Sequence, residues 1–125
     1  MGLFSSKKAR NSIKSVDEPI DGYKMINLFK GVKVRRLGVI PQGTQLGSQV
    51  VLMYQAANKS TCANVSLLLV PQKKLFGHID DEIIGKEIIR CIKNSDKSVA
   101  RITYFNSKPY EYESAIDIAF FKKNK

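Results

Sequence analysis

The sequence contains no tryptophan, a single histidine and two cysteines, and these scarcities limit the chemistry open to its 125 residues. A structural zinc site usually takes four Cys or His ligands, so we expect no metal centre. His78 is the only side chain of the type that exchanges protons near neutral pH, and no nucleophile or ligand set is recognisable around it. We therefore expect a protein that is not an enzyme and that needs no cofactor.

Long apolar runs and paired cysteines are also missing. No apolar run approaches the roughly 20 residues of a membrane-spanning helix, and the N-terminus lacks the apolar core of a secretory signal. Cys62 and Cys91 do not form a Cys-X-X-Cys pair, and we interpret them as free thiols in a reducing compartment. These observations favour a cytoplasmic protein.

The length suits one domain with one hydrophobic core. Residues 1–14 carry four basic residues and no acidic one, with small polar residues between them. Such a segment buries too little apolar surface to offset its ordering entropy. We expect a disordered basic tail over residues 1–19, a single folded domain over residues 20–121 and a short basic tail over residues 122–125.

The charge is strongly one-sided, with 21 basic against 11 acidic residues and a net charge of +10. An excess of this size favours an anionic partner, such as nucleic acid or an acidic membrane surface. It also fits a soluble protein whose basic surface is only solvated.

Short apolar runs between turn residues predict a mainly β chain with short connections. Residues 20–30 fit either a short strand or a helical turn. The four successive apolar residues from Val50 to Met53 suggest a strand that is buried on both faces. Together the runs indicate a small, closed or nearly closed antiparallel barrel of six strands. We expect extended segments over residues 32–40, 49–55, 64–70, 75–79, 98–105 and 115–120.

One helix is expected after the fourth of these segments. Asp80 is a suitable N-cap, and the acidic residues after it favour the positive end of the helix dipole. Gly85 either weakens this helix or lets it approach a strand closely. Apolar residues recur at helical spacing in Ile84, Ile88, Cys91 and Ile92.

The last two segments alternate cleanly. Over residues 98–105, alternation places Ala100, Ile102 and Tyr104 on one face. Over residues 115–120, the inward positions are Ile116, Ile118 and Phe120.

Three segments occur in a distinctive order: Asn64-Val65-Ser66-Leu67 after a polar loop, Gly77-His78-Ile79 before an acidic helix start, and the aromatic end of the last strand at Phe120-Phe121. This order resembles the HIRAN domain, a small β-barrel module, over residues 32–121. The resemblance implies DNA binding, which in studied family members means recognition of single-stranded 3′ ends. It also places His78 where the family can contact the nucleic-acid backbone.

The chain departs from the family where the DNA end would be held. The family carries an aromatic residue and a carboxylate in the loop where this chain reads Ser60-Thr61-Cys62. An aromatic pair of the first barrel strand is replaced by Leu37-Gly38-Val39-Ile40. The barrel of HIRAN, OB or SH3-like type is therefore better supported than end recognition.

We expect a non-enzymatic nucleic-acid-binding module that contacts single-stranded DNA or DNA ends through a basic face. Lys33, Arg35 and Arg36 form the densest basic cluster outside the tails. Aromatic residues could serve as stacking platforms, or they could belong to the core. The candidate contact residues are Lys33, Arg35, Arg36, Tyr54, Lys73, Lys74, His78 and Arg101.

A rival interpretation starts from the N-terminus. The sequence Met1-Gly2-Leu3-Phe4-Ser5-Ser6 matches the pattern for acylation of Gly2, and the basic residues that follow could add an electrostatic membrane signal. On this alternative the chain is a protein-interaction or structural module at an acidic membrane surface. DNA or RNA as the ligand, and the oligomeric state, stay open.

Overall fold

The computed structural model describes residues 14–55, 64–108 and 110–125. Within these ranges the chain forms six antiparallel strands and one helix, and the strands close into a barrel in the order β1-β4-β3-β2-β5-β6. The predicted mainly β, six-stranded antiparallel barrel with one helix is confirmed. The elements are β1 (Tyr23–Arg36), β2 (Gln49–Gln55), β3 (Asn64–Leu69), β4 (Lys74–Ile79), α2 (Glu82–Asn94), β5 (Lys97–Phe105) and β6 (Glu113–Lys123).

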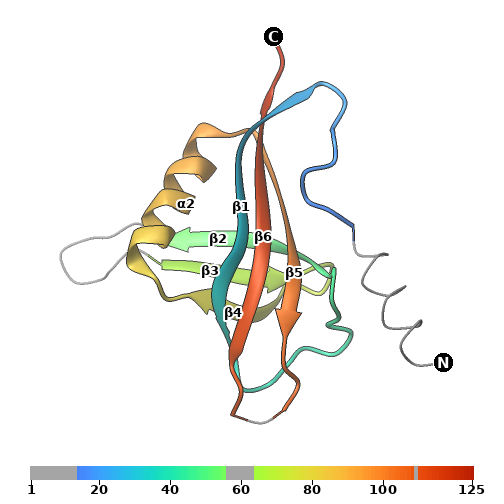
Figure 1. The fold of residues 1–125 in the computed structure, drawn as a ribbon, viewed down its shortest axis with the longest axis vertical. Coiled ribbons are helices and arrows are strands. Elements are labelled where there is room, and N and C mark those ends of the chain that lie inside the picture. The colour runs from blue at the N-terminus through green and yellow to red at the C-terminus, as the bar shows by residue number, and fades with distance from the viewer. Residues whose placement is uncertain (1–13, 56–63, 109) are drawn as a thin grey trace.

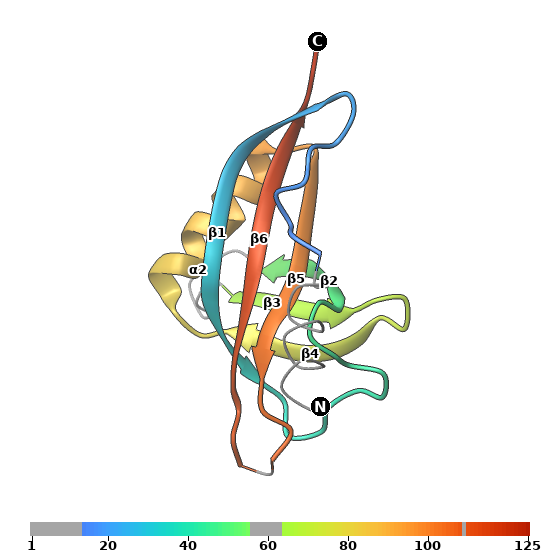
Figure 2. The same ribbon diagram turned by 45° about the vertical axis from the view of Figure 1, so that its right-hand side comes forward.

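The barrel is built from two groups of strands that cross each other. The long strands β1, β6 and β5 run side by side, and β2, β3 and β4 pass across them (Figures 1 and 2). Such crossing sheets enclose one core between their inner faces. The helix α2 lies beside the barrel, and the ends of β1 and β6 project beyond it toward the C-terminus (Figure 1).

The core is formed by alternate residues of every strand. The prediction that Ile116, Ile118 and Phe120 point inward is confirmed, because all three are fully buried. The prediction that β2 is buried on both faces is wrong: Val51 is 39% exposed and Met53 is 54% exposed. An antiparallel strand of a barrel packs one face on the core and leaves the other to solvent.

β1 contains parts of two segments that the sequence pattern predicted to be separate. Residues 23–30 of the ambiguous segment and residues 32–36 of the predicted segment 32–40 form, with Gly31, one strand of 14 residues. Two register shifts against β6, between Met25 and Asn27 and between Phe29 and Val32, interrupt its alternation and hide the pattern. The strand ends at Arg36, so the prediction that residues 37–40 belong to it is wrong.

A bulge also corrects the faces predicted for β5. Its pairing with β6 shifts register between Ile102 and Tyr104. Tyr104 therefore leaves the face of Ala100 and Ile102 and is 49% exposed. Phe105 packs against the core instead, with its ring edge-on to Phe76 at a centroid distance of 6.3 Å.

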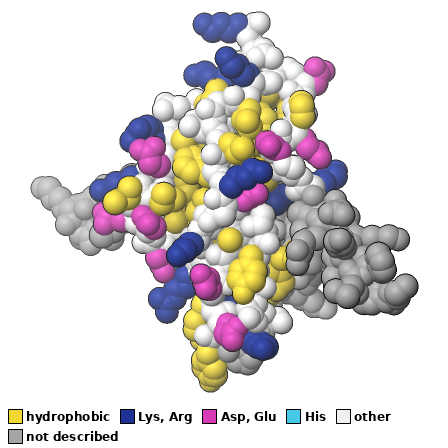
Figure 3. Space-filling model, viewed as in Figure 1, with side chains coloured by type: hydrophobic (Ala, Val, Ile, Leu, Met, Phe, Trp, Pro, Cys, Tyr) yellow, Lys and Arg dark blue, Asp and Glu magenta, His cyan; other side chains and the backbone are white. Residues whose placement is uncertain are grey.

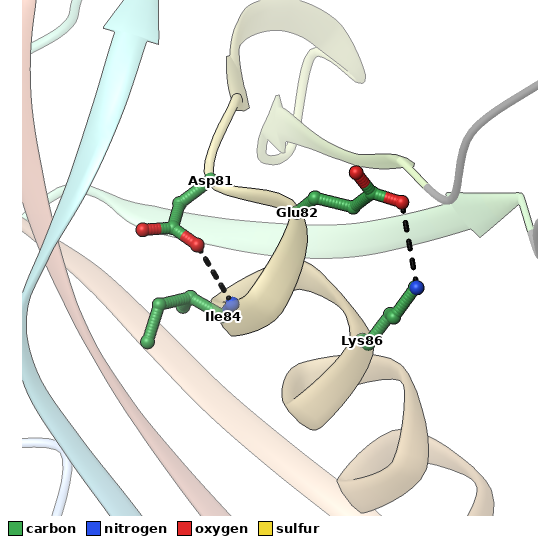
Figure 4. Close-up of polar contacts among 4 residues, drawn as sticks. All are labelled: Asp81, Glu82, Ile84 and Lys86. Carbon is green, nitrogen blue, oxygen red and sulfur yellow. Dashed lines mark hydrogen bonds and ion pairs between the residues drawn. The ribbon is translucent and has the colours of Figure 1, made fainter.

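The helix begins one residue later than predicted, because Asp81 rather than Asp80 is the N-cap of α2 (Figure 4). Asp81 has extended backbone angles, and its Oδ1 accepts a hydrogen bond from the backbone N–H of Ile84 at 3.0 Å. In the first turn, Lys86 Nζ lies 3.4 Å from Glu82 Oε1 (Figure 4). The acidic helix start therefore stabilises the helix terminus itself.

A second hydrophobic cluster lies outside the barrel. Val16 is only 2% exposed and packs with Ala119 and Phe121 on the outer face of β6. Val16 comes from the segment that sequence reasoning assigned to a tail. Together with Ile20, which packs on the same cluster, Val16 holds this segment against the barrel.

A glycine controls how closely β4 approaches β1. Gly77 is buried in β4, and a Cβ atom added there would lie 2.5 Å from the carbonyl oxygen of Arg35 and 2.8 Å from the Cα of Arg36. Gly85 in α2, where the sequence suggested a close helix–strand approach, has no such neighbour within 4 Å. The close approach in this fold is therefore between two strands.

We predict opposite stability effects for alanine at these two buried glycines. Gly77→Ala should lower the free energy of unfolding by about 1–3 kcal/mol or more, because its methyl group would meet backbone that has nowhere to move. Gly85→Ala should raise it by up to about 1 kcal/mol, since alanine favours the helix. Urea denaturation followed by circular dichroism measures both changes. Equal stability of the Gly77→Ala variant and the wild type would contradict the close approach.

Candidate nucleic-acid interface

Three strand pairings bring a row of side chains together on the outer face of the barrel. Arg35 of β1 lies opposite His78 of β4, and His78 lies opposite Ser66 of β3. Ser66 in turn lies opposite Met53 of β2. Directly opposite residues of an antiparallel pair have Cβ atoms about 4.5–5.5 Å apart. Two of the eight predicted contact residues, Arg35 and His78, are thus direct neighbours.

A hydrogen-bonded chain orients the histidine of this row. His78 Nδ1 lies 3.1 Å from Ser66 Oγ, and Ser66 Oγ donates to Asn64 Oδ1 at 3.3 Å. The Nδ1 side of the ring therefore faces Ser66. The imidazole is therefore held with its Nε2 edge directed away from Ser66.

The row borders a hollow with a volume of about 370 Å³. Most of the surface that lines it is apolar, and its lining residues come from β2, β3 and β4. Ser66 and Met53 belong both to the row and to the hollow. The lining residues are Met53, Tyr54, Gln55, Asn64, Ser66, Leu68 and Leu75.

Tyr54 stands at the end of β2, where the hollow meets α2. It lies opposite Val65, is 42% exposed, and has Lys93 Nζ 6.0 Å from its ring centroid. The ring thus combines an accessible face with a nearby cation. It is the predicted aromatic platform that the structure brings to the hollow.

Lys73 and Lys74 lie at the other end of β4, in and next to the turn from β3. Both are exposed, and Lys73 adopts a positive φ of 59°. Lys74 and His78 are four positions apart in the sequence, and this spacing corresponds to about 13 Å along an extended strand. The two lysines therefore extend the basic character of the sheet without joining the row.

Acidic residues lie close to two exposed cations of β1, Lys33 and Arg35. Lys33 and Arg35 line a depression of about 280 Å³ together with Asp80, Asp81 and Glu113. Figure 3 shows the same mixture on a larger scale: over most of this side of the molecule Lys and Arg lie beside Asp and Glu. The predicted basic cluster of β1 is therefore largely compensated by neighbouring charge.

Arg36 does not join Arg35 on the surface. It is 3% exposed, because successive residues of a strand point to opposite faces. Its Nε, Nη1 and Nη2 donate to the carbonyl oxygens of Asn106, Leu37 and Lys108 at 2.8, 2.7 and 2.7 Å. These bonds tie the end of β1 to the connection between β5 and β6, so all of its donor nitrogens are committed to the fold.

Arg101 is likewise separated from the row. It lies on β5 between Gln49 of β2 and Asp117 of β6, and its Nη1 donates to the carbonyl oxygen of Gly47 at 3.0 Å. The barrel order places β2 and β3 between β5 and β4. The structure thus does not bring Arg101 to the face that carries Arg35 and His78.

Cys91 is a core residue. Its side chain is 6% exposed and packs within the main hydrophobic cluster. Burial raises the pKa of the Cys91 thiol, and the nearby Glu87 carboxylate raises it further. A thiol in this setting is a poor nucleophile.

Several sequence predictions fall outside the described residues, namely the acylation pattern at Gly2, the loop residues Ser60-Thr61-Cys62, and Cys62 as a free thiol. Across residues 14–55, 64–108 and 110–125, no three His, Cys, Asp or Glu side chains are grouped to hold a metal ion. In the same ranges, no helix is long and apolar enough to cross a membrane.

Comparisons of the chain with protein-family profiles, with curated protein sequences and with solved structures found no match.

We predict that the neighbouring residues Arg35 and Arg36 differ sharply in their contribution to stability. Arg36→Gln should lower the free energy of unfolding by about 2–4 kcal/mol, because it removes the charged hydrogen bonds to three carbonyl groups that the buried guanidinium makes. Arg35→Gln, the matched control, should change it by less than about 0.5 kcal/mol. Urea titrations of the two variants decide the matter, and similar losses in both would refute the structural role of Arg36.

Proposed function

We propose that this chain is a non-enzymatic module that binds single-stranded nucleic acid across the outer face of β4, β3 and β2. The observation that carries the proposal is the row that leads from Arg35 and His78 to Ser66 and Met53, two residues that line the 370 Å³ hollow. Arg35 supplies a planar cation for a phosphate group, and His78 supplies a ring nitrogen from a fixed imidazole. The hollow beside them supplies apolar contact for an unpaired base.

The composition of the hollow favours binding with little sequence preference. Most of the exposed lining is apolar even though Gln55, Asn64 and Ser66 contribute to it, and one aromatic ring, Tyr54, lines it. Stacking and apolar contacts tolerate any base, whereas sequence readout needs several hydrogen bonds to base edges. A base within a duplex keeps its faces stacked on its neighbours, so the hollow suits a single strand better than a duplex.

The resemblance of residues 32–121 to the HIRAN domain supports the same class of ligand. His78 occupies the position at which that family can contact the backbone, and here it pairs directly with a cation on the next strand. The residues that would grip a terminal hydroxyl in that family are replaced by Ser60-Thr61-Cys62. We therefore propose contact with internal positions of the strand and not recognition of its 3′ end.

Fluorescence anisotropy with a labelled 20-nucleotide oligomer, in a salt series, tests this proposal. The wild-type chain should bind the single strand more tightly than the corresponding duplex, and oligomers with 3′-hydroxyl and 3′-phosphate ends should bind equally. Arg35→Gln should weaken single-strand binding about three- to tenfold through the loss of a charged contact. The affinity should also fall steeply as salt rises.

Arg90→Gln is the matched control, because it removes one exposed arginine from α2, where Arg90 pairs with Glu87 at 2.6 Å. Its affinity should stay within about twofold of the wild type, because Arg90 does not line the hollow and its charge is paired with that of Glu87. No binding of the wild type at low salt would sink the proposal. Equal losses in the Arg35 and Arg90 variants would show attraction by net charge without a specific surface.

A further inference from the structure

Five exposed lysines gather where β1, β5 and β6 project beyond the barrel. Figure 3 shows Lys and Arg side chains predominating at this upper end of the molecule, in contrast to the mixed charges below. The sequence indicated only the last three of these residues as a basic tail. We call this group the lysine end, and its members are Lys24, Lys97, Lys122, Lys123 and Lys125.

The lysine end accounts for much of the charge imbalance. Five of the 21 basic residues belong to it, and four more, Lys7, Lys8, Arg10 and Lys59, lie outside the described ranges. Two of the 11 acidic residues, Asp21 and Asp96, lie next to the lysine end, and the other nine are spread among the 12 remaining cations. The lysine end therefore carries about half of the net positive charge of the described residues in a small part of their surface.

Two of these lysines occupy directly opposite positions on neighbouring strands, where like charges destabilise the sheet. Lys24 of β1 and Lys122 of β6 are directly opposite in the antiparallel ladder. Like charges in this arrangement repel each other and destabilise the pair of strands. An anion placed between the two ammonium groups would remove the repulsion.

The other face of the same strand ends carries a second pair of lysines around an aromatic ring. Tyr23 of β1 lies opposite Lys123 of β6, and Lys97 Nζ of β5 is 5.7 Å from the centroid of the Tyr23 ring. Tyr23 is half-buried, so part of its ring remains accessible. Cations beside an accessible aromatic ring are the combination that single-stranded nucleic acid uses for backbone and base contacts.

The acidic residues near the lysine end are fewer than its lysines. Asp96 is adjacent and partly offsets the charge, and its Oδ2 accepts the backbone N–H of Lys123 at 2.7 Å. Among the ion pairs found in the described residues, none includes a lysine of this group. The ammonium groups are therefore available to an external anion.

We propose that the lysine end is a second contact surface for the phosphodiester backbone of the same single strand. This inference rests on the proposed function and adds a site to it. Lysines on both faces of a narrow strand end suit a flexible polyanion that can pass around it. A flat acidic bilayer meets one plane only, so it would engage one of the two lysine pairs.

The distance between the two surfaces sets the length of strand required. Glu113, the β6 partner of Arg35, and Lys122 are nine residues apart, which is roughly 30 Å of extended strand. At the spacing of about 3.4 Å per phosphate in a stacked strand, roughly nine nucleotides cover this distance. An oligomer of four nucleotides is too short to reach both surfaces in this form.

The test uses anisotropy with oligomers of 20 and of 4 nucleotides. In Lys24→Gln/Lys122→Gln, affinity for the longer strand should fall about tenfold at low salt. The slope of log affinity against log salt should become shallower by about 1.4, as expected when two phosphate contacts are lost. The melting temperature should stay equal or rise, because the like-charge repulsion is gone, and this shows that the variant is folded.

Lys86→Gln/Arg90→Gln is the matched control, because it removes two exposed charges from α2. It should retain wild-type affinity and salt slope. The four-nucleotide oligomer should show a smaller effect of Arg35→Gln and of the lysine-end variant than the longer strand does, since it cannot occupy both surfaces together.

The possible outcomes separate the two proposals. Loss of binding in Arg35→Gln with unchanged binding in the lysine-end variant would overturn this inference and leave the proposed function intact. Loss in the lysine-end variant alone would support the lysine end and overturn the hollow as a contact site. No binding of any oligomer by the wild type would overturn both. Binding of the wild type to phosphatidylserine vesicles but not to oligomers, lost in the lysine-end variant, would reassign the surface to membranes.

Discussion

The close contact between β4 and β1 is the constraint on which the remaining structure depends. These strands share only two register pairs, Arg35 with His78 and Arg36 with Gly77, yet this short seam closes the barrel on that side. Gly77 allows it because a side chain there would collide with the backbone of β1. The same seam places Arg35 beside His78, so the geometry that closes the core also assembles the exposed row. The exposed row that contains Arg35 and His78 therefore depends on the same close contact of β4 with β1 that encloses the core.

The adjacent residues Arg35 and Arg36 have different roles, because one is exposed on the barrel surface and the other is buried. Arg36 turns inward and its guanidinium group binds three carbonyl oxygens, which anchor the connection between β5 and β6. Arg35 turns outward beside His78. A buried guanidinium group is tolerated when all of its donors are satisfied, whereas an exposed one is free to exchange water for an anionic ligand. The alternation of side chains along β1 therefore decides which of the two arginines is exposed to a ligand.

The charge of the molecule is organised along the barrel axis and not over one face. Around the middle of the barrel, Lys33 and Arg35 share their surroundings with Asp80, Asp81 and Glu113. At the projecting ends of β1 and β6, Lys24 and Lys122 lie directly opposite each other. Repulsion of this kind lowers stability, and the anionic ligand that we propose would relieve it. A strand held at the hollow and at the lysine end would be bound by two modest sites whose effects combine.

The sequence by itself determined the number of strands, the single helix and the inward residues Ile116, Ile118 and Phe120, because each depends on local periodicity and turn residues. It could not reveal the bulges that lie within the single strand of residues 23–36 or that turned Tyr104 outward, since a register shift depends on the partner strand. The candidate site divides in the same way. Arg35 and His78 were recognisable as chemical types, but only tertiary structure made them neighbours, buried Arg36 and separated Arg101. The lysine end was hidden because Lys24, Lys97 and Lys122 are distant in sequence and meet only through strand pairing.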